Sequence, residues 1–369
     1  MFSVKICFFG GYDPLYPRNA VLREGLRLNG AEVFECRAPG REKFWLRYPR
    51  LFFRGLAAAR RADVVFVPEF RQKDVPLARL TSALLGRRLV HDPLASRYET
   101  KILDWRRMPP SSVEARWNLV IDRWAFLMPG LVLADTAAHA EYFRTRFGLA
   151  PRKTAVVPVG YDDRIFIPKG GPKSGPSGVF TVLFIGSFLP LHGVESIVRA
   201  AAIVGPRDRS VVFRLVGDGQ TRPAAVSLAG RLGADNVLFE GWSALGDLPG
   251  RIEAADVCLG LFGRTEKAAR VVPHKIFQAM GMGKPVVTAR TPAVEEFFSH
   301  REHVYVCDPP WPESLAAAVL ELKADKRLRD RIAGNGLELV RSRYAPRPLG
   351  RLLLDALARS AARSGGGAP

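Results

Sequence analysis

Short apolar runs alternate with segments of helical periodicity along most of the chain. In the first half, strand-like runs cover residues 4–10, 32–37, 63–69, 88–92, 131–135 and 154–159. In the second half, they cover residues 181–186, 211–216, 237–240, 256–262, 285–289 and 304–307. Strands that alternate with helices predict parallel sheets covered on both faces, so we expect an α/β fold with two Rossmann-like domains.

A segment dense in Pro, Gly and Ser, residues 169–178, separates the two halves. Because 369 residues exceed one ordinary core, we expect an N-terminal domain at 1–168 and a C-terminal domain at 179–345. Residues 346–369 are expected to form a last helix and a disordered tail that begins at Ser364.

The most informative stretch, residues 271–288, lies between the strands at 256–262 and 285–289. Pro273 precedes a short helical pattern that contains His274, Lys275 and Gln278. This order places the N-terminus of a helix at the carboxyl end of a strand, which suits a phosphate-bearing ligand. The strand at 181–186 is followed in the same way by a loop with Gly186, Ser187 and His192, and Gly217 ends the next strand.

Residues 270–287 resemble the donor-site signature of family 4 glycosyltransferases, Glu-x7-Glu-Ala-Met-Ala-x-Gly-Lys-Pro-Val, with Arg270 and Gln278 at the two Glu positions. Residues 158–168 are similar to the family's Pro-x-Gly-x-Asp-x-x-x-Phe-x-Pro hinge. The resemblance is strong in the second half and moderate in the first. It implies the GT-B fold, in which two Rossmann-like domains face each other across a cleft and the last helix crosses back to the first domain.

The resemblance also implies a retaining transfer of a sugar from a nucleoside diphosphate sugar. The donor would be bound by Gly186, Ser187, His192, Gly217, Arg270, His274, Lys275 and Gln278. His192 replaces the family's Lys, so it can donate one hydrogen bond but lacks a fixed charge; capping of the helix is the alternative. Lys275 either contacts the diphosphate or is a solvated lysine, and Gln278 either bonds the ribose or is an ordinary helix residue.

In the first domain, His91 and Asp92 end a strand and are similar to the family's His-Asp pair. His91 is the catalytic candidate, since an imidazole can receive a proton or orient a hydroxyl; a buried histidine bonded to backbone is the alternative. On the acceptor side we expect Asp92 together with Gly10 and Gly11, which could equally form a tight turn. No Asp-x-Asp pair ends a strand, so we expect no metal and no cofactor.

A basic amphipathic segment covers residues 41–61. Its helical pattern places Arg47, Arg50 and Arg54 on one face and aromatic residues including Trp45 and Phe52 on the other, as in monotopic membrane contacts. Packing of the aromatic face on the sheet is the alternative. The net charge of +19 favours polyanionic partners, and the first residues do not resemble a signal peptide.

These patterns together predict a cytoplasmic glycosyltransferase of polysaccharide biosynthesis, peripheral on the inner face of the cell membrane. Its partners would be a nucleotide sugar and a lipid-linked or cell-envelope glycan acceptor. The alternatives are a catalytically weak membrane-associated scaffold and a non-hydrolysing nucleotide-sugar epimerase. Nucleic-acid binding is suggested by charge alone, without a recognised module.

Overall fold

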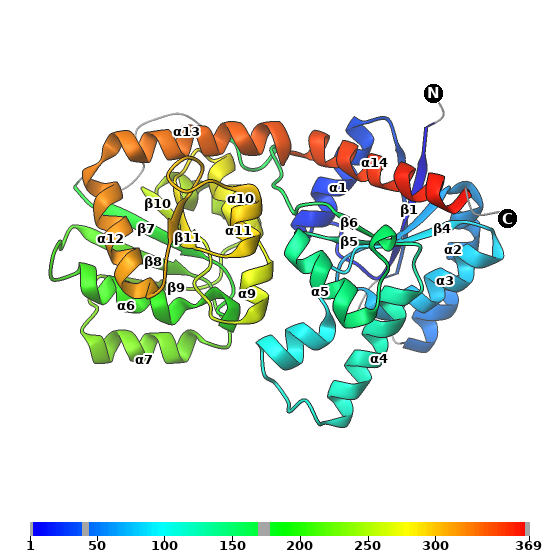
Figure 1. The fold of residues 1–369 in the computed structure, drawn as a ribbon, viewed down its shortest axis with the longest axis horizontal. Helices are drawn as coiled ribbons and strands as arrows, with labels where there is room; N and C mark the ends of the chain where they lie inside the picture. The colour runs from blue at the N-terminus through cyan, green and yellow to red at the C-terminus, as the bar shows by residue number, and fades with distance from the viewer. Residues whose placement is uncertain (1–2, 39–43, 169–177, 366–369) are drawn as a thin grey trace. The chain divides into compact units, whose positions relative to one another are not determined.

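The computed structural model describes residues 3–38, 44–168 and 178–365, and the chain divides into two compact units (Figure 1). Unit 1 comprises Met1–Val159 and Ala345–Pro369, and unit 2 comprises Gly160–Tyr344. The first boundary therefore lies nine residues before the predicted one, because Tyr161 is buried and its N–H donates to the Tyr344 carbonyl within unit 2. The expected linker at 169–178 falls almost wholly outside the described residues.

Unit 1 contains a parallel sheet in which the described residues form six strands, in the order β2-β1-β3-β4-β5-β6. They are β1 (Lys5–Gly10), β2 (Glu32–Arg37), β3 (Val64–Val67), β4 (Arg88–His91), β5 (Leu131–Ala134) and β6 (Thr154–Val156). The direction of the order reverses between β1 and β3, which is where ligands bind in open α/β sheets.

Helices cover both faces of this sheet: α1 (Pro17–Leu28), α2 (Phe44–Arg61), α3 (Val75–Leu84), α4 (Val113–Leu127), α5 (Ala137–Phe147) and α14 (Pro346–Gly365). Three short helical turns complete the unit: η1 (Gln72–Asp74), η2 (Glu99–Asp104) and η3 (Pro151–Lys153). Since side chains alternate along a strand, Ile6 and Phe8 enter the core under α1 and α14, whereas Cys7 and Phe9 enter the core under α2 to α5.

The last helix, α14, packs against α1 inside unit 1, as the resemblance implied (Figure 1). The two helices touch at Gly25 and Gly350, where a Cβ atom on Gly25 would lie 2.1 Å from the Pro346 oxygen. Glycine at both positions therefore allows the close crossing. Helix α14 continues to Gly365, beyond the predicted start of the tail, and residues 366–369 lie outside the described part of the chain.

Unit 2 also holds a parallel sheet, with the order β12-β11-β10-β7-β8-β9 in the described residues. The strands are β7 (Phe180–Ile185), β8 (Val211–Val216), β9 (Val237–Glu240), β10 (Val257–Leu259), β11 (Val286–Ala289) and β12 (Tyr305–Cys307). The order reverses between β7 and β10. The loops that follow these two strands carry the stretches that the sequence singled out for phosphate binding.

The helices of unit 2 are α6 (Val194–Val204), α7 (Arg222–Leu232), α8 (Leu248–Glu253), α9 (Glu266–Arg270), α10 (His274–Gly281), α11 (Pro292–Phe297), α12 (Trp311–Ala324) and α13 (Lys326–Arg343). Two short 3-10 turns, η4 (Pro190–His192) and η5 (Leu245–Asp247), precede α6 and α8. One core joins the apolar face of α6 to Phe184, Phe213 and Phe262.

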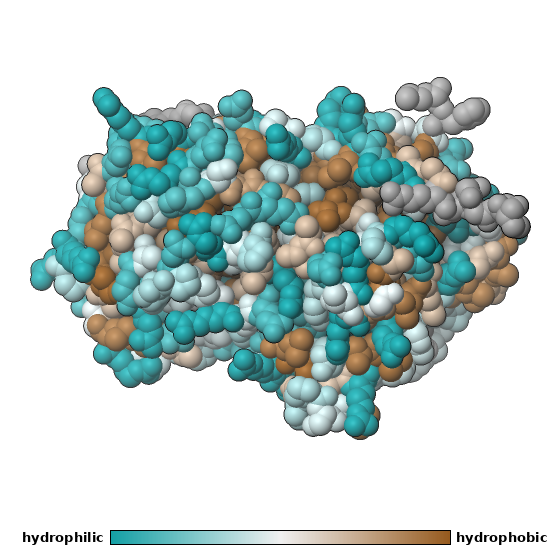
Figure 2. Space-filling model, viewed as in Figure 1, coloured by the Kyte–Doolittle hydropathy of each residue, from teal (hydrophilic) through white to brown (hydrophobic). Residues whose placement is uncertain are grey.

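The surface carries many charged groups, and on the face drawn in Figure 2 hydrophilic side chains are interspersed with scattered hydrophobic ones. None of the described helices is both long and apolar enough to cross a bilayer. Exposed apolar side chains nevertheless gather on α2, where Trp45, Leu46 and Phe53 are each more than three-fifths exposed.

Candidate active site

Lys275 and Gly186 meet at the switch point of the unit 2 sheet. Gly186 follows β7 directly and Lys275 is the second residue of α10. A Cβ atom on Gly186 would lie 2.5 Å from the Lys275 nitrogen, so only glycine lets the amine occupy this position. The structure therefore brings together two of the predicted donor-site residues from opposite sides of the switch point.

The Lys275 amine is fully buried and lies 3.8 Å from the centroid of the Phe184 ring. It has no hydrogen-bond partner among the described residues. Burial holds the pKa of this amine well below its usual value. A buried cation without a partner is destabilising, and an anion placed beside it would remove that penalty.

His192 belongs to the same cluster. It lies in η4 just before α6, its ring packs edge-on to Phe184, and its Nδ1 bonds the Ser187 carbonyl. Burial, together with the charge of Lys275, lowers the pKa of His192 well below its usual value. The imidazole is therefore neutral, and with Nδ1–H donating to Ser187 its Nε2 acts as an acceptor.

The other predicted donor residues of unit 2 are Gly217, Gln278, Arg270 and His274, and they differ in burial and in hydrogen-bond partners. Gly217 follows β8, and a Cβ atom there would lie 2.0 Å from the Gly186 oxygen. Gln278 is buried and makes no side-chain hydrogen bond to the described part of the chain. Arg270 pairs with Glu266 in α9 at 2.5 Å, and His274 Nδ1 lies 3.3 Å from the Gly160 oxygen.

In unit 1, His91 and Asp92 are both fully buried at the end of β4. His91 Nδ1 bonds the Val67 oxygen at 3.0 Å, while Nε2 has no partner among the described residues. Burial lowers the pKa of His91 to about 4, so the ring is neutral near pH 7. A base this weak suits acceptance of a hydrogen bond better than removal of a proton.

Asp92 forms a buried ion pair with Arg18 of α1, whose Nε lies 2.6 Å from Asp92 Oδ2. The two Nη atoms of Arg18 and Oδ1 of Asp92 are buried without a partner among the described residues. Asn19 donates to Glu69 after β3 at 2.8 Å, and burial followed by the charge of Asp92 raises the pKa of Glu69 to about 9. Donors and acceptors that could bond a polar ligand thus surround the end of β4.

Two features of unit 1 escaped the sequence analysis. His139 of α5 lies between Asp135, at 2.6 Å, and Glu99, at 3.2 Å. Arg18 and Asn19, near the start of α1, were not singled out from the sequence. A usable signal was present, because Glu69, Asp92 and Asp135 are each the last residue of a predicted strand, and the carboxyl ends of parallel strands share one edge of a sheet.

The Gly10–Gly11 turn, expected on the acceptor side, is bonded by the protein's own carboxylate. Gly11 N–H donates to Asp74 Oδ2 at 2.9 Å, and Arg47 and Arg71 pair with the same Asp74. Arg47 is consequently buried, unlike the exposed membrane-facing cation that the sequence pattern suggested. Of the other predicted contact residues, Trp45, Arg50 and Arg54 are exposed and Phe52 is half-buried.

Asp162, in the segment similar to the family hinge, accepts hydrogen bonds from the Arg164 side chain and backbone. Within the described ranges, no group of three or more His, Cys, Asp and Glu side chains is arranged to hold a metal ion.

Two parallel-sheet α/β units, each with polar residues at the switch point of its sheet, define the GT-B class of fold. Residues 179–325 match the family model of the glycosyl transferases group 1, and residues 3–160 match that of the glycosyl transferase 4-like domain. The chain belongs to the group 1 glycosyltransferases.

Curated relatives agree with this family. The chain is 27% identical over 189 residues to the lipopolysaccharide core biosynthesis glycosyltransferase LpsD of Rhizobium meliloti, covering 51% of this chain and 52% of that protein. It is 27% identical over 232 residues to the D-inositol 3-phosphate glycosyltransferase of Thermomonospora curvata, covering 57% and 53%. The chain thus spans about half the length of the curated relatives it matches.

Solved structures share the fold over nearly the whole chain. Anabaena HepE, in complex with UDP and glucose, superposes with a TM-score of 0.70 at 21% identity, covering 96% of this chain and 99% of that one. The sucrose-phosphate synthase of Thermosynechococcus elongatus superposes with a TM-score of 0.71 at 17% identity, covering 98% and 100%.

Proposed function

We propose that this protein transfers a sugar from a nucleoside diphosphate sugar to an acceptor hydroxyl, with retention of configuration. The observation that carries the proposal is the buried Lys275 amine, which lacks a partner among the described residues at the switch point of unit 2. Family membership and the UDP bound to Anabaena HepE support a nucleotide sugar as the donor.

The donor diphosphate would lie beside Lys275 and the first turn of α10. The backbone N–H groups at the start of a helix and its dipole attract an anion, and the amine adds a point charge in a site where burial strengthens the interaction. Gln278, one turn further on, would bond the ribose through its amide. This arrangement neutralises a leaving diphosphate with the chain's own groups, so the proposal requires no metal and no cofactor.

The acceptor would bind in unit 1 at the end of β4. The Nη atoms of Arg18 and the free oxygen of Asp92 could bond its hydroxyl or anionic groups, and His91 Nε2 could orient the reacting hydroxyl. The donor cluster around Lys275 offers no carboxylate nucleophile among the described residues, and in unit 1 Asp92 is already paired with Arg18. That fits a retaining reaction in which the departing diphosphate helps the transfer.

We place the acceptor in a lipid-linked or cell-envelope glycan, reached from the inner face of a membrane. The exposed Trp45, Leu46 and Phe53 of α2 and the net charge of +19 support a peripheral contact with an anionic membrane. The lipopolysaccharide core function named for LpsD points in the same direction.

A scaffold without strong catalysis remains the second candidate. It is favoured by Arg270, which pairs with Glu266 where relatives of this family carry a glutamate for the donor. The epimerase alternative has no comparable support, since the described residues around Lys275 include no carboxylate that could act as its acid or base.

Thermal stabilisation by UDP-, GDP-, ADP- and dTDP-sugars tests the proposal, because a ligand that binds the native state raises the melting temperature. One nucleotide should stabilise the wild type but not Lys275→Ala. Lys326→Ala, which changes an exposed lysine of α13 paired with Asp330, is the matched control and should respond like the wild type. Release of the nucleoside diphosphate with time would then separate an enzyme from a scaffold. Absence of any shift would favour the scaffold.

A further inference from the structure

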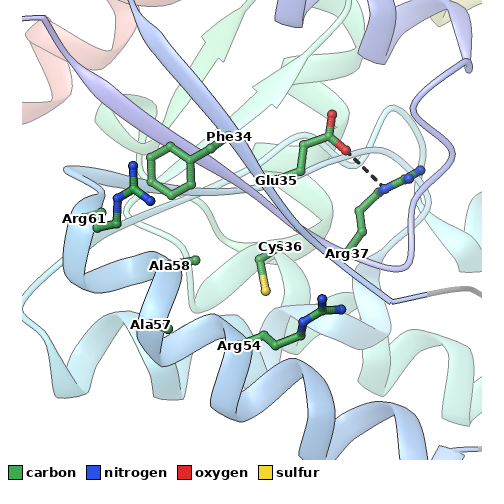
Figure 3. A pocket seen from close by; sticks show the side chains of 8 residues that line it. All are labelled: Phe34, Glu35, Cys36, Arg37, Arg54, Ala57, Ala58 and Arg61. Atoms are coloured by element: carbon green, nitrogen blue, oxygen red, sulfur yellow. Dashed lines mark ion pairs between the residues drawn. The ribbon is translucent and has the colours of Figure 1, made fainter.

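A cavity of 610 Å³ lies at the outer edge of the unit 1 sheet, between the edge strand β2 and helix α2 (Figure 3). It is lined by Phe34, Glu35, Cys36 and Arg37 of β2 and by Arg54, Ala57, Ala58 and Arg61 of α2. None of the switch-point residues described above lines it. The cavity is therefore a separate feature that the proposed reaction does not use.

The sequence of α2 explains why this space is unfilled. Positions 54, 57, 58 and 61 share one face of the helix, following the i, i+3, i+4, i+7 spacing. The two middle positions are alanines, which are too short to fill the gap toward Phe34 and Cys36. The two outer positions are arginines, and Figure 3 shows them at opposite ends of the cavity.

Positive charge exceeds negative charge around the cavity. Glu35 is already shared by Arg37, at 3.1 Å, and by Arg23. Arg61 lies over the Phe34 ring at 5.5 Å and has only a long contact of 3.5 Å with Glu32. Arg54 makes no hydrogen bond or ion pair with the described residues, so its five donors face the solvent at the cavity mouth.

The same helix exposes bulky apolar side chains beside this positive cavity. Leu46 is 63% exposed and Phe53 69% exposed, and at 100° per residue they lie on the sector next to Arg50. Apolar side chains that enter the interfacial region and arginines that contact phosphates are the two components of a peripheral membrane surface.

We propose that this cavity binds the phosphate-bearing headgroup of an anionic phospholipid. Arg54 and Arg61 would donate charge-assisted hydrogen bonds to the phosphate oxygens, with Arg37 at the rim, while Leu46 and Phe53 enter the membrane interface. The inference rests on the membrane contact of the proposed function but requires neither nucleotide binding nor sugar transfer.

Vesicle co-sedimentation tests the site, with vesicles of phosphatidylcholine alone or mixed three to one with phosphatidylglycerol. The wild type should bind the mixed vesicles only. Arg60→Ala removes an exposed arginine of α2 that does not line the cavity and should weaken binding roughly fivefold, as expected for one cation at an anionic surface. Arg54→Ala and Arg61→Ala should each weaken it more than tenfold. Unchanged melting temperatures would show that the variants fold.

Glycerol 3-phosphate, added as a soluble competitor, distinguishes the lipid from a free phosphate. Competition with mixed vesicles at millimolar concentration supports a headgroup site. Stabilisation by glycerol 3-phosphate without vesicle binding overturns the lipid assignment, and equal losses in Arg54→Ala and Arg60→Ala overturn the cavity. A failure of nucleotide sugars to stabilise the protein would contradict the proposed transfer while leaving the vesicle result intact.

Discussion

The side-chain nitrogen of Lys275 lies 3.8 Å from the centroid of the Phe184 ring, at the base of the loop that begins with Gly186. The negative face of an aromatic ring partly offsets the buried charge, but a ring does not replace hydrogen bonds to an anion. Burial therefore disfavours the charged form of the amine, and a diphosphate beside it would favour that form.

Lys275→Met should stabilise the protein in the absence of nucleotide while abolishing stabilisation by the nucleotide sugar. A buried polar group without a partner destabilises a protein by about 1–3 kcal/mol. The methionine side chain is of similar length and has no amine, so it removes this penalty. Urea unfolding with and without the nucleotide measures both effects. A destabilised Lys275→Met protein would mean that the lysine has a structural role in the fold.

Nucleotide binding should be accompanied by proton uptake at Lys275. Burial lowers the pKa of the amine, and a diphosphate beside it would raise that pKa. Uptake should grow as the pH rises above the lowered pKa and be absent in Lys275→Met. Calorimetry in buffers of different ionisation enthalpy between pH 7 and 9 measures it; identical heats in all buffers would contradict the prediction.

The stability of unit 1 should fall between about pH 6.5 and 9 because of His139. Burial lowers the pKa of this imidazole, but Asp135 and Glu99 outweigh burial and raise the pKa to about 9. Because the unfolded value is about 6.5, the favourable contribution is complete below pH 6.5 and is lost as the pH rises through 9.

This contribution of His139 amounts to at most about 3 kcal/mol. Unfolding free energies of the wild type and His139→Asn should converge with rising pH. The raised pKa of Glu69 also makes stability fall with rising pH, but it does so equally in the wild type and in His139→Asn. The difference between their unfolding free energies therefore reports on His139 alone. A difference that does not change with pH would refute the charged imidazole.

Removing Arg18 should destabilise the protein by about 3–5 kcal/mol, since Asp92 would remain buried without its partner. Arg18→Met combined with Asp92→Asn should recover part of this loss, because no uncompensated carboxylate remains. Urea unfolding of the single and double variants measures the coupling. Additive losses would show that the two side chains act independently.

The exposed apolar side chains of α2 should contribute to vesicle binding. Trp45→Ala combined with Phe53→Ala should weaken binding to vesicles with phosphatidylglycerol about tenfold or more, given the free energy of burying large apolar side chains. Trp242→Ala, which removes a still more exposed tryptophan from unit 2, is the control and should have no effect. Equal effects of both changes would argue against a specific contact through α2.

Local sequence patterns predicted some of the site residues but not those whose partners are distant along the chain. Gly186, His192 and Lys275 were predicted from the order of strand, glycine turn and helix start, which are local features, and they do lie together. Helical spacing placed Arg47 on an exposed basic face, but the structure shows it buried in an ion pair with Asp74, which is 27 residues away in the sequence. Arg18 was missed for the same reason, because its partner Asp92 is 74 residues away.

The amino-acid sequence by itself determined the alternation of strands and helices, the parallel sheets and the family, since apolar periodicity and turn residues act over a few positions. The tertiary structure alone decided the partners of the buried charges, the neutral state of His91 and the cavity between β2 and α2. These depend on which distant side chains meet away from water, where the energy of a charge follows from its neighbours in space and not from its neighbours along the chain.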